Sequence, residues 1–119
     1  MIKAYKLLCG ADGHSYVQEG RIEEGIITKA HHIHFMETAA NASYDWHTAP
    51  QTQYVLTLRG TLEFTTSLGQ TFTLRTGEVL VATDTNGFGH KWKLVGSDPW
   101  IRAYIVFDPT VEINFTAET

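Results

Sequence analysis

The chain has 119 residues, of which 43% are hydrophobic and 18% are charged, and its formal net charge is -4. This composition is typical of a globular protein and unlike that of a disordered chain, and the length suffices for one hydrophobic core. The negative charge and the lack of any cluster of Lys and Arg argue against nucleic acid as a partner.

The compartment is predicted from the cysteine content and from the N-terminus. Cys9 is the one cysteine, so it has no partner for an internal disulfide, and the first residues contain no apolar signal segment. Apolar runs such as residues 104–107 have the length of a strand and are too short to cross a membrane. We therefore expect a cytoplasmic protein without a membrane partner, with Cys9 as a small buried side chain of the first strand.

Short β-strands are predicted from end to end. Apolar and polar residues alternate with a period of two, and the alternating segments are rich in Val, Thr, Phe and Tyr. Gly, Asn, Asp and Ser mark the turns between them. In chain order, the predicted strands span residues 2–8, 31–37, 52–59, 61–67, 70–75, 78–83, 90–95 and 100–107. This pattern predicts one all-β domain over residues 1–119, either a sandwich or a barrel.

The segment 52–59 has one mixed and one apolar face. Residues 53, 55 and 57 (Gln, Val, Thr) form the first face, which we expect to line the mouth of a barrel. The second face carries Tyr54, Leu56 and Leu58 and has to be covered, either by the N-terminal segment or by a second copy of the chain. Apolar strand faces of this kind favour a homodimer.

In the segment 90–95, a histidine is predicted to point inward. His90 and Trp92 share one face, whereas Lys91 and Lys93 occupy the other. Because two lysines on one face place that face in solvent, His90 is expected to lie inside the fold beside Trp92.

The segment 46–60 resembles the first sequence motif of the cupins, which contains two histidines, a glutamate and a glycine. With Gly60 at the glycine position, His47 stands at the first histidine, Ala49 at the second and Gln53 at the glutamate. Gln53 and Ala49 depart from the family pattern, because neither is the usual charged or imidazole ligand.

The second cupin motif runs from a glycine to a histidine, and here it is matched by Gly77 and His90 with a short insertion. The resemblance covers residues 35–107 and extends to a subgroup of small one-domain cupins with a similar N-terminus. It implies a double-stranded β-helix (jelly-roll) barrel of antiparallel strands, with a core over about residues 30–108 and a ligand site in its open mouth. It implies no particular reaction.

The metal implied by the cupin resemblance has an incomplete set of ligands here. Three imidazoles and one carboxylate suit Fe, Mn, Ni or Zn, whereas this chain offers His47, Gln53 and His90. Gln53 provides an oxygen but no charge, so a divalent ion would be held more weakly. Gln53 can equally act as a hydrogen-bonding residue that lines the barrel. We expect either one divalent transition metal or no cofactor.

Four further residues are predicted near the ligand. Trp46 and Trp92 flank the two histidines in sequence, Val55 follows Gln53 on the same face, and Asp84 lies six residues before His90 within the second motif. Three of them also have a structural interpretation: the two tryptophans can serve packing, and Asp84 can satisfy a buried His90.

A second group of histidines occurs at residues 31–34. His32 and His34 share one face of the predicted strand, a spacing that can hold a metal. Ile33 and Phe35 are the better core residues, which would turn the histidines outward. His34 is therefore kept only as a reserve ligand.

Two functions fit these residues. The first is a small-molecule enzyme, with or without metal, in which His47 and His90 are catalytic and the reaction is that of a lyase, isomerase or dioxygenase. The second is a metal-free module that binds a small molecule without turnover. That the protein is an enzyme is an expectation and not a conclusion from the sequence.

Overall fold

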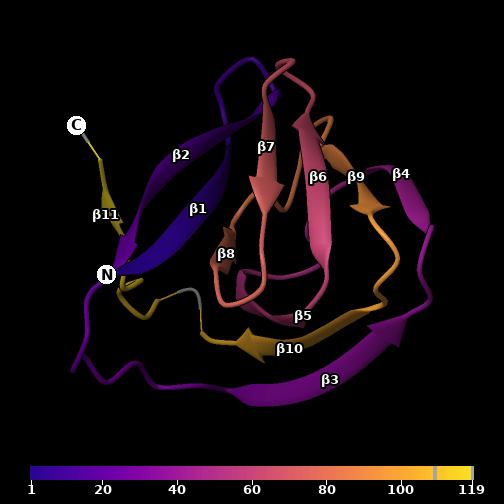
Figure 1. Ribbon diagram of the computed structural model, residues 1–119. Helices are drawn as coiled ribbons and strands as arrows, with labels where there is room; N and C mark the ends of the chain where they lie inside the picture. Colours follow the sequence, from indigo (N-terminus) through magenta and orange to yellow (C-terminus); the bar gives the residue numbers. More distant parts are fainter. Residues whose placement is uncertain (109, 119) are drawn as a thin grey trace.

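The computed structural model describes residues 1–108 and 110–118, which fold into two β-sheets without a helix (Figure 1). The strands are β1 (Ile2–Cys9), β2 (Ser15–Ile22), β3 (His32–Thr38), β4 (Ser43–His47), β5 (Gln53–Arg59), β6 (Thr61–Thr66), β7 (Thr71–Leu74), β8 (Val79–Ala82), β9 (His90–Val95), β10 (Trp100–Val106) and β11 (Thr116–Ala117). Within this part of the chain, no segment forms a helix with the length and hydropathy needed to span a bilayer.

The larger sheet has the strand order β11-β2-β1-β8-β5-β10-β3, and the smaller one has the order β4-β9-β6-β7. Neighbouring strands are antiparallel except β1 and β8, which run parallel. The all-β prediction is confirmed. The barrel is corrected to two separate sheets, because the edge strands of one sheet do not pair with those of the other among the described residues.

All eight predicted strands overlap a strand of the structure, and β2, β4 and β11 were not predicted. β2 lacks an alternating apolar face: Ser15 is buried because it bonds to another side chain, and Gly20 is buried because the chain of β11 packs on it. In β4, four of the five residues are exposed, so no apolar face signals the strand. Cys9 ends β1 and is partly exposed, not buried.

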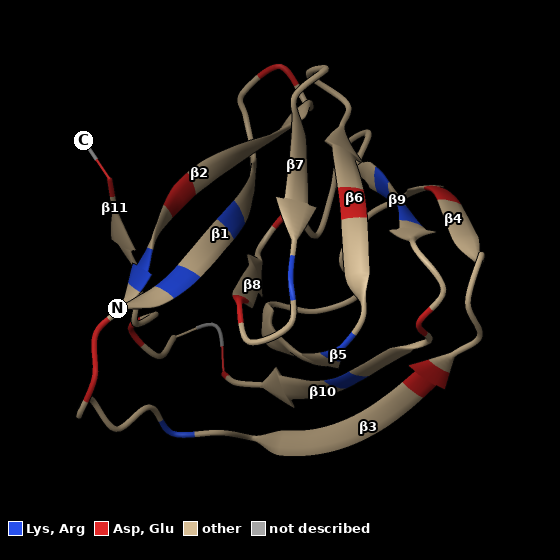
Figure 2. Cartoon of the chain, in the orientation of Figure 1, with Lys and Arg blue, Asp and Glu red and all other residues tan. Residues whose placement is uncertain are grey.

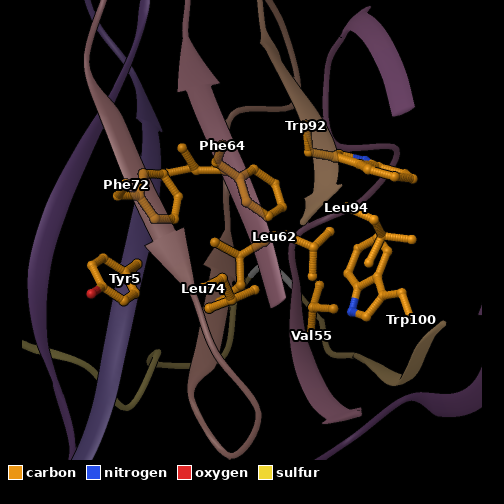
Figure 3. Packing of buried hydrophobic residues seen from close by; sticks show 11 residues of the cluster. Tyr5, Val55, Leu62, Phe64, Phe72, Leu74, Trp92, Leu94 and Trp100 are labelled. Atoms are coloured by element: carbon orange, nitrogen blue, oxygen red, sulfur yellow. The ribbon is translucent and has the colours of Figure 1, made fainter. Parts of the chain in front are cut away.

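The main core lies between the two sheets. It contains aromatic and aliphatic side chains of both, as Figure 3 shows for the residues around Phe64 and Trp92. Its buried members are Tyr5, Leu7, Val55, Leu62, Phe64, Phe72, Leu74, Leu80, Trp92, Leu94 and Trp100. The inward orientation predicted for the 90–95 strand is confirmed, because His90, Trp92 and Leu94 are buried and the two lysines are exposed.

A second core covers part of the outer face of the larger sheet. Tyr54 packs there with Phe107, and partly buried Val111, Ile113 and Phe115 pack against this cluster. The Tyr54 hydroxyl donates a hydrogen bond of 2.9 Å to the carbonyl oxygen of Asn114. The covering element is therefore largely the C-terminal segment, and neither of the two covers predicted from the sequence.

The outer face stays open near the edge strand β3. Ile33 is 54% exposed and Phe35 is 66% exposed, which corrects their predicted place in the core. Opposite residues of paired strands share a face, and His34 lies opposite Tyr104 of β10, whose side chain points between the sheets. Consequently Ile33 and Phe35 face solvent, and a homodimer through this face stays a prediction.

Candidate functional site

A pocket of about 400 Å³ opens between the two sheets and is lined mainly by apolar side chains. Strands β3, β4, β5, β6, β8, β9 and β10 all contribute to it, together with the loop after β4. Its apolar wall includes Val55, Phe64, Leu80, Ala82, Trp92, Trp100 and Val106, and its polar groups include His34, His47, Gln53, His90, Arg102 and Tyr104. A concave apolar cavity with a few polar groups is typical of a small-molecule site.

His90 is held in one orientation by a buried carboxylate. Nδ1 of His90 lies 2.6 Å from Oδ2 of Asp84, and the Ser15 hydroxyl donates to the same oxygen at 2.6 Å. Asp84 is fully buried and His90 nearly so. Because the carboxylate accepts, Nδ1 of His90 carries a proton, and in the neutral imidazole Nε2 therefore has a free lone pair.

His47 is fixed in the same tautomer by a different partner. Its Nδ1 donates to the carbonyl oxygen of Asp45 at 2.7 Å, which leaves Nε2 unprotonated. A register shift between Tyr44 and His47 in the pairing of β4 with β9 places both side chains against the pocket, although they are three residues apart.

The two histidines meet edge to face. The ring centroids of His47 and His90 are 4.5 Å apart, and the two residues are direct partners in the β4–β9 ladder. The ring centroids of Tyr44 and His47 are 4.1 Å apart, and those of Phe64 and His90 are 5.8 Å apart. The site thus presents two oriented, basic imidazole nitrogens beside an apolar wall.

Burial lowers the pKa of His47 below its ordinary value of 6.5, and a charge on His90 would lower it further; the Asp45 carbonyl and the Asp84 carboxylate act in the opposite direction. The unfolded chain therefore binds the His47 proton more tightly than the folded protein does. As the pH falls below 6.5, the free energy of unfolding should decrease by a contribution that His47→Gln abolishes. NMR titration of the imidazole and urea unfolding at several pH values check both statements; a His47 midpoint at or above 6.5 would contradict them.

The structure brings most of the predicted site residues together. His47, Gln53, Val55, His90 and Trp92 all line the one pocket, although they come from three strands. Val55 and Trp92 are also members of the main core, so both interpretations of Trp92 apply to the same side chain.

Two predicted substrate-binding residues lie outside the pocket wall. Trp46 is 47% exposed and lies under the Lys91 ammonium group, 4.8 Å from Nζ to the ring centroid. The register shift in β4 places His47 on the side of the pocket, so the neighbouring Trp46 points away from the pocket. Asp84 lies behind His90, and its carboxylate is hydrogen-bonded to that imidazole. This position agrees with the structural interpretation, in which Asp84 satisfies a buried His90.

His34 lines the pocket and stacks on Tyr104 with the ring centroids 4.8 Å apart, which corrects its predicted outward orientation. Arg102 was missed altogether. The signal was present in the sequence, since Trp100, Arg102 and Tyr104 alternate on one face of a strand that is otherwise apolar.

The side chains fit a divalent metal poorly. Among residues 1–108 and 110–118, no three His, Cys, Asp or Glu side chains are grouped to hold one. His47, Gln53 and His90 would supply two imidazoles and a neutral amide, and the described residues that line the pocket include a guanidinium but no carboxylate. A dication in such a site would keep its full charge in partly apolar surroundings.

Comparisons with known proteins add the following. No protein-family model matches the chain, and no curated protein is significantly similar to it in sequence. Among solved structures, it is similar to the crystal structure of protein NMB1881 from Neisseria meningitidis, with 16% identity and a TM-score of 0.45. That match covers 73% of this chain and 88% of the other.

Proposed function

We propose that this protein is a small-molecule enzyme of the lyase or isomerase type, built on a jelly-roll fold of the cupin kind. Its pocket would bind an organic molecule with a carbonyl group and transfer a proton at the neighbouring carbon. One observation carries this proposal: the ring centroids of His47 and His90 lie 4.5 Å apart on the pocket wall, and each Nδ1 donates a hydrogen bond to a fixed acceptor. Both Nε2 atoms are therefore available as bases.

His90 is the better candidate for the base. Asp84 would stabilise the imidazolium that forms when Nε2 of His90 takes a proton from the substrate carbon. The electron pair left behind moves onto the carbonyl oxygen, to which the Gln53 amide hydrogens can donate. The proton then returns to a different carbon in an isomerase, or a leaving group departs in a lyase. His47, neutral near pH 7, would accept a second proton, for example from a substrate hydroxyl group.

A metal-free binding module is the second candidate. It is favoured by the predominance of apolar lining residues, among them Val55, Leu80 and Trp92, which would capture a ligand without any proton transfer.

Deuterium exchange distinguishes the two candidates without knowledge of the complete reaction. A set of small carbonyl compounds with acidic C–H groups is incubated in D₂O with the protein, and NMR records both binding at the histidines and loss of the C–H signal. We expect exchange with the wild type and at least about 100-fold slower exchange with His47→Gln/His90→Gln. Compounds that bind at the pocket without any exchange would support the binding module, and no binding at all would overturn both candidates.

Metal content is predicted to be low. In protein purified without an affinity tag and incubated with Fe(II), Mn(II), Ni(II) or Zn(II), mass spectrometry should find less than about a tenth of an equivalent. Near-stoichiometric metal that disappears in the variant His47→Ala/His90→Ala would contradict this prediction. It would instead establish His47, Gln53 and His90 as ligands of a metal-dependent lyase or oxygenase.

A further inference from the structure

A buried arginine forms part of the pocket wall. Arg102 retains only 5% of its accessible surface, and a register shift beside it in the β10–β5 pairing helps to set its direction. Its guanidinium carbon lies 3.9 Å from the centroid of the Trp100 ring and 5.5 Å from that of Tyr104. Nε donates to the Tyr104 hydroxyl at 3.0 Å, and Nη1 donates to Oγ1 of Thr38 at 2.6 Å and to the Trp100 carbonyl oxygen at 3.4 Å.

All of these partners are neutral. Arg102 forms no ion pair within the described residues, and no Asp or Glu is found among the residues that line the pocket. Arg102 is the one charged residue of β10, which pairs with β5 on one side and β3 on the other. Figure 2 shows β10 with a blue segment between these two strands. A guanidinium stays ionised at all accessible pH values, so its burial without an opposite charge is costly.

One nitrogen of the guanidinium remains free. Nη2 has no hydrogen-bond partner in the described part of the chain, and it is not one of the buried polar atoms that are sealed off from solvent. Nη2 therefore has donor capacity left, and Arg102 is one of the residues that line the pocket. From this free donor and the missing counter-charge, we propose that Arg102 binds a carboxylate group of the ligand. This inference rests on the proposed small-molecule site and names the class of its ligand.

The remainder of the ligand follows from the contacts of Arg102. Trp100 and Trp92 lie next to each other in the core (Figure 3), and their rings meet edge to face with the centroids 4.9 Å apart. Arg102 stacks on the ring of Trp100. His90 precedes Trp92 by two residues on the same face of β9. A ligand would thus place its carboxylate at Arg102, lay an apolar body along the two tryptophans and bring its reacting carbon to the histidines.

A carboxylate suits this site better than a phosphate. One guanidinium supplies a single positive charge, which balances the one negative charge of a carboxylate. A phosphate monoester carries a charge near -2 and needs further donors, and the lining residues include no Lys and no second Arg.

The test compares ligands that differ only in charge. Phenylacetate, 3-phenylpropionate, their amides and phenyl phosphate are titrated into the full-length protein, and NMR of the histidine and tryptophan side chains reports where each one binds. With the wild type, we expect each carboxylate to bind at least about tenfold more tightly than its amide. With Arg102→Gln, this difference should fall to less than about twofold, while the amide still binds. Arg59→Gln is the matched control, because Arg59 is exposed and pairs with Asp98 on the surface.

Two further measurements keep the test decisive. Should Arg102→Gln not fold, Arg102→Lys replaces it; this variant keeps the charge but not the planar guanidinium, and it should reduce the preference for the carboxylate at least about threefold. Equal binding of carboxylate and amide to the wild type, or tighter binding of phenyl phosphate, would overturn the carboxylate assignment alone. If none of the compounds, and none of the carbonyl compounds used for deuterium exchange, shifted a pocket resonance, the small-molecule site itself would be refuted.

Discussion

Gly89→Ala is expected to destabilise the protein by at least roughly 3 kcal/mol and to separate the two histidines of the site. Gly89 has a φ of +77°, and a Cβ added there would lie 2.0 Å from the carbonyl oxygen of His47 and 2.5 Å from its carbonyl carbon. Those atoms belong to the backbone of β4 and cannot rotate away, so β4 has to move. Because His47 pairs directly with His90, the movement falls on the site.

Gly77→Ala is the matched control for this prediction. Gly77 also has a positive φ, +88°, but a Cβ there would meet no atom within 4 Å. Only the backbone strain of a left-handed residue remains, which costs about 1–2 kcal/mol. Urea unfolding measures both variants, and NMR of the histidine side chains reports the site. Equal losses of stability in the two variants, or unchanged histidine signals in Gly89→Ala, would contradict this prediction, because β4 would then accommodate the added Cβ at no cost in free energy.

Asp84→Asn should lower the free energy of unfolding by about 2–4 kcal/mol and slow deuterium exchange at least about 100-fold. Asp84 is fully buried, and its Oδ2 accepts from both Ser15 and His90. Its Oδ1 is buried without a partner in the described structure. If the Asn amide nitrogen took the place of Oδ1, it would be a buried donor without an acceptor. If it took the place of Oδ2, it would be a third donor facing the two donors of Ser15 and His90.

Ser15→Ala distinguishes the effect of Asp84 on stability from its effect on the His90 imidazole. It removes one of the two hydrogen bonds to Asp84 and leaves the carboxylate on Nδ1 of His90 in place. We expect a loss of about 1–2 kcal/mol and exchange within about threefold of the wild type. NMR of the imidazole nitrogens should show a change of the His90 tautomer in Asp84→Asn only. An Asp84→Asn protein with the wild-type tautomer and rate would refute the role of the carboxylate.

Alternation along the chain was sufficient to predict the strands that have one apolar face. In β9, buried and exposed residues alternate as the sequence predicts, which places His90 inside the fold. β2 and β4 show no such alternation, because the burial of β2 depends on contacts with distant residues and β4 is mostly exposed. Period-two reasoning detects a face that is already apolar in the sequence.

The residues of the pocket were predicted with mixed success. His47, Gln53 and His90 were chosen by motif, and they line one pocket because the register of β4 on β9 and the inward face of β5 place them there. Trp46 was assigned to the same site by its position next to His47. A register shift that leaves no mark in the sequence turned it outward.

Composition and alternation by themselves predicted the all-β fold and the inward-facing His90, since both depend on local sequence. The cover of the outer face by the C-terminal segment, the orientation of β3 and the pairing of Ser15 with Asp84 depend on contacts between residues far apart in the chain. Among the described residues Arg102 pairs with no acidic side chain, and this too depends on contacts between residues far apart in the chain. Whether a buried charge has a counter-charge is decided by which strands become neighbours, and the packing of the whole chain sets that.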